Sequence, residues 1–363
     1  AQAIARFSNA AQTIRLRHAG TAAEGGLLLD LGRAQSAAGQ EEAALETYAR
    51  AFDLFQQQRG ALGASADDAA PYFDLLLKRI KSDPGKADDY KARFFNAASS
   101  VVSNATAQTV SKLAARVASG DSAVTGLVRA LEDTRRELRA AEAQAANLQA
   151  ANAYAGQERT DLEARLKTLQ EQADSLERQL LEANPRYSQL VSSQASLADL
   201  QQVIAKDEAY VKVLLLDSRG YGLLVTPDKV EPYAIELNRG TAGAAVRRLR
   251  APFEAEDTLP AFDVAELREL FRDLFGPVAN DVMAAKHLIY EPDGALISLP
   301  VATLVTADPS ALLAKVADGG DPDYRQVSWL GAKTDSALVL SAASFMQSRA
   351  FAPSRATQSF LGF

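Results

Sequence analysis

Three side chains that often bind metals stand close together near position 290. His287, Glu291 and Asp293 would share one face of an extended strand, because side chains alternate between the two faces. An imidazole and two carboxylates are typical metal ligands. Pro292, however, starts a turn that interrupts a regular array of ligands. The sequence therefore favours a core or edge histidine beside a turn acid, and we predict neither a metal nor any other cofactor.

Residues for nucleophilic catalysis are scarce. The chain contains no cysteine, which excludes disulfides, thiolate metal sites and a cysteine nucleophile within these residues. It has two histidines, and His18 is interpreted as a surface or packing residue of an alanine-rich helix. The Gly-x-Ser-x-Gly turn that holds the nucleophile of many serine hydrolases is also missing. We therefore assign no catalytic, cofactor-binding or metal-binding residue.

Two arginine-containing stretches allow two interpretations each. Arg247-Arg248-Leu249-Arg250 could bind an acidic partner, but its place near the end of an expected helix favours contacts with the last carbonyls of that helix. Arg219-Gly220-Tyr221-Gly222 is too short for a phosphate-binding loop and fits a hairpin turn.

The stretch Lys286–Leu304 indicates an α/β domain. Residues 287–290 form a short apolar run that predicts a buried strand, and Pro292-Asp293-Gly294 is a turn signal. We expect residues 295–299 to pair back as a second strand, and Pro300 to start a helix. Further predicted elements are helices at 197–204, 240–250, 263–283 and 336–349, and strands at 210–216, 221–226, 230–237, 327–330 and 358–363, with a loop-like excursion at 307–324. Alternation of strands and helices implies a partly parallel sheet.

The N-terminal part is expected to be helical. Residues at the spacing of one tetratricopeptide repeat are Leu28, Leu31, Gly32, Gly39, Ala44, Tyr48 and Ala51. A plain helical hairpin with small residues at its contacts is the alternative. An amphipathic segment follows at 71–81, and residues 88–119 predict further helices.

Two apolar heptad patterns then predict a coiled coil. The first is Val124, Leu127, Leu131, Thr134, Leu138, Ala141, Ala145 and Leu148, and the second is Leu162, Leu166, Leu169, Ala173, Leu176 and Leu180. Residues 152–157 weaken the pattern, which favours an antiparallel hairpin. One long helix that pairs with another chain remains the alternative, because the heptad phase continues.

Charge and hydrophobicity argue against two kinds of partner. A net charge of −7 and a pI of about 5.2 argue against nucleic acid as a partner, and no apolar run is long enough to span a membrane. The first residue is alanine and the last residues look like a core strand, so we expect a fragment of a longer protein.

The order of these features resembles that of bacterial CHAT-domain proteins, in which tetratricopeptide repeats precede a caspase-like domain. Each matching piece is short, but the ordered set is fairly specific and covers nearly the whole chain. The pieces are residues 114–121, 127–129, 184–190, 196–197, 200–201, 206–209, 292–294, 299–300 and 359–363.

The resemblance implies a caspase-like α/β fold of the peptidase clan that includes caspases and separases, with a histidine and cysteine as catalytic dyad. In the family this dyad lies downstream of the strand that Ser359–Phe363 resembles, so no residue here receives either role. The expected domains are a TPR-like helical region at 1–118, a coiled-coil hairpin at 119–183 and the front of a caspase-like domain at 184–363.

Two functions follow from this organisation. The first is the regulatory and front part of a CHAT-type cysteine peptidase, inactive as this chain. The second is a non-catalytic interaction scaffold. Both predict a protein or peptide partner on the helical region, for which residues 28–55 are the candidate surface, and a possible homo-oligomer through the coiled coil. Neither predicts nucleic acid or membrane as a partner. The resemblance suggests the cytoplasm, with export after signal-peptide removal as the alternative.

Overall fold

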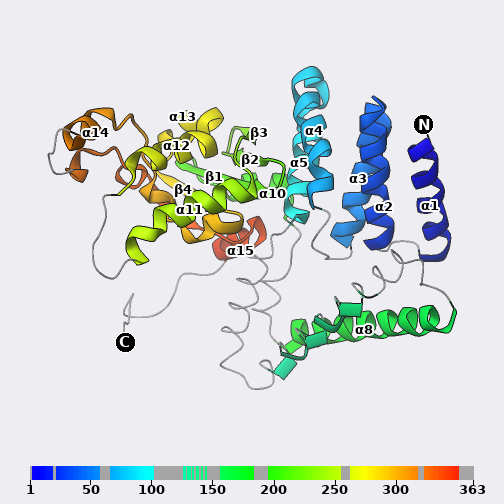
Figure 1. Ribbon diagram of the computed structural model, residues 1–363. Coiled ribbons are helices and arrows are strands. Elements are labelled where there is room, and N and C mark those ends of the chain that lie inside the picture. The colour runs from blue at the N-terminus through cyan, green and yellow to red at the C-terminus, as the bar shows by residue number, and fades with distance from the viewer. Residues whose placement is uncertain are drawn as a thin grey trace. The chain divides into compact units, whose positions relative to one another are not determined.

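The computed structural model of the chain describes residues 2–18, 22–57, 66–101, 156–183, 195–254, 262–317 and 323–350, together with part of 126–144 (Figure 1). The chain divides into two compact units. The first unit joins Ala1–Ala107 with Ser193–Phe363, and the second is Gln108–Ser192. Within the first unit, we call helices α1 to α5 the helical region and residues 195–350 the α/β part.

The helical region begins with α1 (Gln2–His18), α2 (Ala22–Ala37) and α3 (Glu41–Gln57). Gly39, with a φ of 73°, lets the chain reverse between α2 and α3, because glycine adopts positive φ without strain. The two helices approach closely at Gly32, where an added Cβ would lie 3.0 Å from ring atoms of Tyr48. A helical hairpin with a small residue at its contact therefore lies where the repeat spacing is found. This geometry is common to a tetratricopeptide repeat and to a plain helical hairpin, so it does not distinguish between them.

The next helices complete the helical region. α4 (Ala70–Ser82) confirms the predicted amphipathic segment, with Pro71 in its first turn and its apolar side buried. After a single 3-10 turn at Pro84–Lys86, α5 (Ala87–Ser100) buries Phe94 and Phe95. The rest of the predicted helical stretch, from 102 to 119, lies outside the described residues.

A five-stranded mixed sheet forms the centre of the α/β part. The strands are β1 (Glu208–Leu215), β2 (Gly220–Val225), β3 (Val230–Ile235), β4 (His287–Glu291) and β5 (Asp335–Leu338). Their order is β3-β2-β1-β4-β5, in which β1 to β3 are antiparallel neighbours and β1, β4 and β5 are parallel. The predicted hairpin between the first two strands is confirmed. Pro232 lies in the edge strand β3, where a missing N–H donor is tolerated.

Every residue of β1 is buried because both faces of the sheet are covered. One face packs against α4 and α5 of the helical region, and also against α10 (Leu197–Val203) and α15 (Ala342–Ala350). The other face packs against α11 (Arg239–Glu254) and α12 (Val264–Phe275). Alternate residues of β1 divide accordingly: Tyr210 and Leu214 join the first core, and Val211 and Val213 join the second. Helices thus cover a sheet on both sides.

Three predictions around the sheet are wrong, each at a position next to proline or glycine. The helix expected at 263–283 ends at Phe275, and a 3-10 turn with Pro277 separates it from α13 (Ala279–Ala284). The strand expected at 295–299 is a 3-10 helix, Gly294–Ser298. Gly294 has a φ of 59°, which turns the chain away from the sheet. After Pro300, the expected helix amounts to one 3-10 turn, Val301–Thr303.

The C-terminal predictions also need correction. Residues 327–330 make a single bridge, between Val305 and Trp329, in place of a strand. The helix expected at 336–349 starts at Ala342, because the preceding residues pair with β4 as β5. The excursion at 307–324 contains a helix, α14 (Ser310–Ala317). The strand expected at 358–363 lies outside the described residues.

The second unit contains α8 (Gly156–Ala183), whose Leu162 and Leu169 pack in one cluster with Ala141. Leu138 and Leu166 flank this cluster. In one straight helix, Ala141 and Leu162 would stand about 30 Å apart, at 1.5 Å per residue. The contact of Ala141 with Leu162 and Leu169 is therefore not one that a single straight helix would make, and the hairpin stays a prediction. None of the helices in the described ranges is both long and apolar enough to cross a bilayer.

Candidate functional site

The sheet separates the three side chains that could have formed a metal site. His287 begins β4, where its Nδ1 lies 3.5 Å from the carboxylate of Asp335. Glu291 ends the same strand, about 13 Å away at roughly 3.3 Å per residue. Asp293 lies beyond the strand in the turn. Among the residues with a described position, no group of three or more metal-binding side chains occurs.

Glu291 belongs to a buried polar cluster on the face of the sheet that the helical region covers. Lys212 on β1 is the register partner of Glu291, and its ammonium forms an ion pair with Oε1. The Tyr210 hydroxyl donates to Oε2 of the same carboxylate. Burial, together with the nearby Glu291 charge, raises the pKa of Tyr210, so the hydroxyl stays a donor.

The side chains of this polar cluster are almost completely shielded from solvent. Lys212 and Glu291 are 8% and 5% exposed, and Tyr210 is fully buried. Each carboxylate oxygen of Glu291 already accepts from a buried donor, Tyr210 or Lys212, so its charge is paired within the cluster. A buried ion pair contributes little net stability, but removal of one partner leaves a costly buried charge. The cluster therefore fixes the register between β1 and β4.

Asp293 braces the carboxyl ends of the parallel strands, where open α/β sheets usually hold their ligands. Its side chain is buried, and Oδ2 accepts a hydrogen bond of 2.9 Å from the Leu215 N–H at the end of β1. The residue thus joins the turn after β4 to the end of the neighbouring strand. Asp293 is a structural acid, as the turn interpretation of the sequence proposed.

The arginine cluster on α11 differs from its prediction. The helix continues to Glu254, four residues beyond Arg250, so these arginines do not stand at its end. Instead, Arg248 Nε donates to Glu266 of α12 at 2.9 Å, and Arg250 donates to the Ser298 carbonyl at 3.0 Å. Two of the three arginines therefore tie α11 to its neighbours.

The Arg219-containing turn contacts the helical region. Arg219 Nη1 donates to Asp74 of α4 at 2.9 Å, and the Tyr221 hydroxyl lies 3.0 Å from both the same carboxylate oxygen and the Ala70 carbonyl. Asp67 accepts bonds from the Asp217 and Ser218 N–H groups at 2.7 and 3.1 Å. Sequence reasoning missed this contact, because its partners lie about 150 positions apart and no local pattern connects them.

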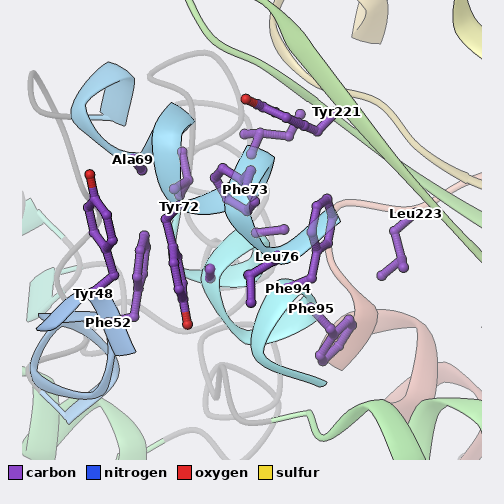
Figure 2. Close-up of a cluster of buried hydrophobic side chains, with 14 of the residues drawn as sticks. Tyr48, Phe52, Ala69, Tyr72, Phe73, Leu76, Phe94, Phe95, Tyr221 and Leu223 are labelled. Atoms are coloured by element: carbon purple, nitrogen blue, oxygen red, sulfur yellow. The ribbon is translucent and has the colours of Figure 1, made fainter. Parts of the chain in front are cut away.

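Aromatic rings continue the same interface into the core (Figure 2). The ring of Tyr221 lies 4.8 Å from Phe73 of α4 and 6.2 Å from Phe94 of α5, between centroids. Tyr72 of α4 stacks on Tyr48 and Phe52 of α3 at 5.1 and 5.3 Å. Aromatic pairs at these distances stabilise packing beyond the area they bury. The helical region and the sheet therefore share one core.

Much of the candidate partner surface at residues 28–55 is buried in the structure. The large apolar residues within 28–55 are core residues, among them Leu29, Leu45 and Tyr48, each at most 1% exposed. The outer side of α3 is acidic instead, with Glu42 and Glu46 at 72% and 74% exposure. A partner of α3 can therefore meet these carboxylates but not the apolar side chains.

In comparisons with known proteins, no family model matches this chain, and no curated protein or solved structure matches it. Its function is therefore inferred from the residues and their geometry.

Proposed function

We propose that this chain binds a protein or peptide partner through its helical region, as the helical and front α/β part of a CHAT-type protein. The observation that carries the proposal is the acidic outer side of α3. Its carboxylates are held in place by bases of the next helices: Arg79 contacts Glu42 at 2.7 Å, and Arg93 contacts Glu46 at 3.3 Å.

These ion pairs define the chemistry of the partner. Exposed pairs contribute about 0–1 kcal/mol each, so an incoming cation can compete for the carboxylates. The remaining oxygen lone pairs of Glu42 and Glu46 face solvent and can accept further hydrogen bonds. The partner we propose is therefore a protein segment that carries lysine or arginine. Stacked helices of repeat proteins bind partners on such extended faces.

The α/β part supports the proposed CHAT-type assignment through its general architecture. A sheet with parallel strands and helices on both faces agrees with a caspase-like fold, and many other α/β proteins share this arrangement. Without a cysteine, the chain supplies no nucleophile for the peptidase reaction. We propose that this chain serves recognition.

The alternative is a scaffold that has no catalytic part, in which the second unit could also pair with a second copy. The intact mass of the protein from its source separates the two. A natural chain that continues beyond Phe363 through a histidine and a cysteine favours the peptidase. A natural mass near 38.7 kDa favours the scaffold.

Partner binding is tested with a photo-crosslinking residue, p-benzoylphenylalanine, placed at Glu46 of the full chain. The same residue at Arg325, which is 91% exposed on the α/β part, is the matched control. We expect a protein to be captured from Glu46 and not from Arg325. Capture is then followed by calorimetric titration of the purified partner.

In that titration, Glu42→Lys with Glu46→Lys should weaken binding at least about tenfold, because two attractive contacts become repulsive. Affinity for the unaltered chain should also fall with added salt. The control variant Arg325→Glu should bind as the unaltered chain does. Equal affinity of the charge-reversed variant would refute the α3 surface.

A further inference from the structure

The turn between β1 and β2 is held from the helical region by one carboxylate. Asp67 lies in the 3-10 turn Ala66–Ala69 that precedes α4. Its Oδ1 accepts from the N–H groups of Asp217 and Ser218, the two central residues of the hairpin turn. Because these donors are backbone groups, the carboxylate fixes the backbone of the turn itself.

Hydrogen bonds continue from this turn to the carboxyl end of the parallel strands. Arg239 Nη1 donates to the Asp217 carboxylate at 2.6 Å, and its Nη2 donates to the Leu215 carbonyl at 3.0 Å. The N–H of Leu215 in turn donates to Asp293 at 2.9 Å. One connected path therefore runs from Asp67 through Asp217, Arg239 and Leu215 to Asp293.

We propose that Asp67 positions the carboxyl edge of the sheet through this path, so that a shift of the helical region changes the geometry at Asp293. The proposal concerns a conformational link built into the fold. It does not depend on the proposed partner, because the link exists in the chain alone. Its direct consequence is that the amide of Leu215 loses protection when Asp67 no longer holds the turn.

The neighbouring residue supplies a matched control. Asp68 lies on the same 3-10 turn, but its carboxylate binds Arg33 at 2.6 Å and does not reach the hairpin. Asp67→Ala and Asp68→Ala remove the same charge from adjacent positions. A difference between the two variants therefore reports the contact with the hairpin turn, and not the loss of an acid from this part of the surface.

The experiment measures amide hydrogen exchange by NMR on the full chain labelled with ¹⁵N-leucine. The exchange rate of Leu215 is divided by that of Leu288, which is fully buried in β4, so that a change in global stability cancels. In Asp67→Ala we expect this ratio to rise at least about threefold, as weakening of one hydrogen bond allows. In Asp68→Ala the ratio should stay unchanged.

Two results would overturn the proposal. One is a ratio that stays constant in Asp67→Ala, because both amides then respond to stability alone. The other is an equal rise in both variants, which would indicate a general effect of the lost charge. Should Asp67→Ala fail to fold, Asp67→Asn keeps an acceptor oxygen and is compared with Asp68→Asn. A smaller but selective rise is then expected, and its absence refutes the link.

Discussion

Gly222 shows how one residue type decides the packing of a sheet face. It lies in β2 opposite Tyr233 of β3, and a Cβ at this position would collide with the tyrosine ring. The ring is buried, and its hydroxyl donates to the Leu274 carbonyl at 2.9 Å. Because that hydrogen bond holds the ring in place, the ring cannot move aside without loss of its partner.

We therefore expect Gly222→Ala to lower the free energy of unfolding by about 1–3 kcal/mol, the usual cost of overpacking. Urea denaturation followed by circular dichroism measures the change. Gly276→Ala is the control, because nothing lies within 4 Å of its added Cβ and its φ of −43° suits alanine. That variant should stay within about 0.5 kcal/mol. Equal effects of both would argue against the collision.

At the scale of elements, the second unit gathers predicted heptad positions from both apolar patterns into one cluster. Leu131, Ala173 and Leu180 are buried, as are the residues of the Ala141 cluster, and the other described heptad positions are half-buried. Two antiparallel stretches can bury these positions against each other within one chain. Pairing between two chains is therefore not required for their burial.

A short bismaleimide crosslinker tests the hairpin prediction, since the chain has no cysteine of its own. We expect Ala141→Cys with Leu162→Cys to give a link within one chain, seen as a crosslinked species of monomer mass. In the control, Ala141→Cys with Leu180→Cys, the second cysteine lies about 27 Å further along α8 and should give no link. Products of twice the mass from the first pair would instead indicate pairing between chains.

The strands β1 and β2 could be predicted because apolar runs bounded by turn residues leave few alternatives. The β5 segment could not, since its residues also fit a helix and only pairing with β4 decides between them. The 3-10 helix at Gly294–Ser298 depends on the positive φ of Gly294, which an apolar pattern does not reveal. The contact of Asp67 with the hairpin was beyond sequence reasoning, because it joins residues 150 positions apart.

At the scale of the molecule, buried tyrosines link the fold to alkaline pH. Burial is the main cause that raises the pKa of six of them above the ordinary value of 10.0, namely Tyr48, Tyr72, Tyr210, Tyr221, Tyr233 and Tyr290. These phenols keep their protons in the folded chain when the unfolded chain has released them. Their contribution to stability is thus complete below pH 10 and is lost as pH rises above it.

We expect the free energy of unfolding to fall steadily above about pH 10. Absorbance at 295 nm should show these six tyrosines ionising only when the far-ultraviolet circular dichroism is lost. In Tyr221→Phe, five tyrosines should remain in that delayed step. Ionisation of all six near pH 10 with the dichroism intact would contradict the burial of their hydroxyls.

The shared core of the first unit also sets an order of events during synthesis. Phe73 packs against Tyr221, so its partner is made 148 residues later, on the order of 10 to 30 s at usual rates of translation. The whole Gln108–Ser192 unit leaves the ribosome within that interval. Until β2 emerges, Phe73 and Phe94 lack the Tyr221 ring that covers them in the folded chain, so we expect the nascent chain to expose apolar surface during this interval.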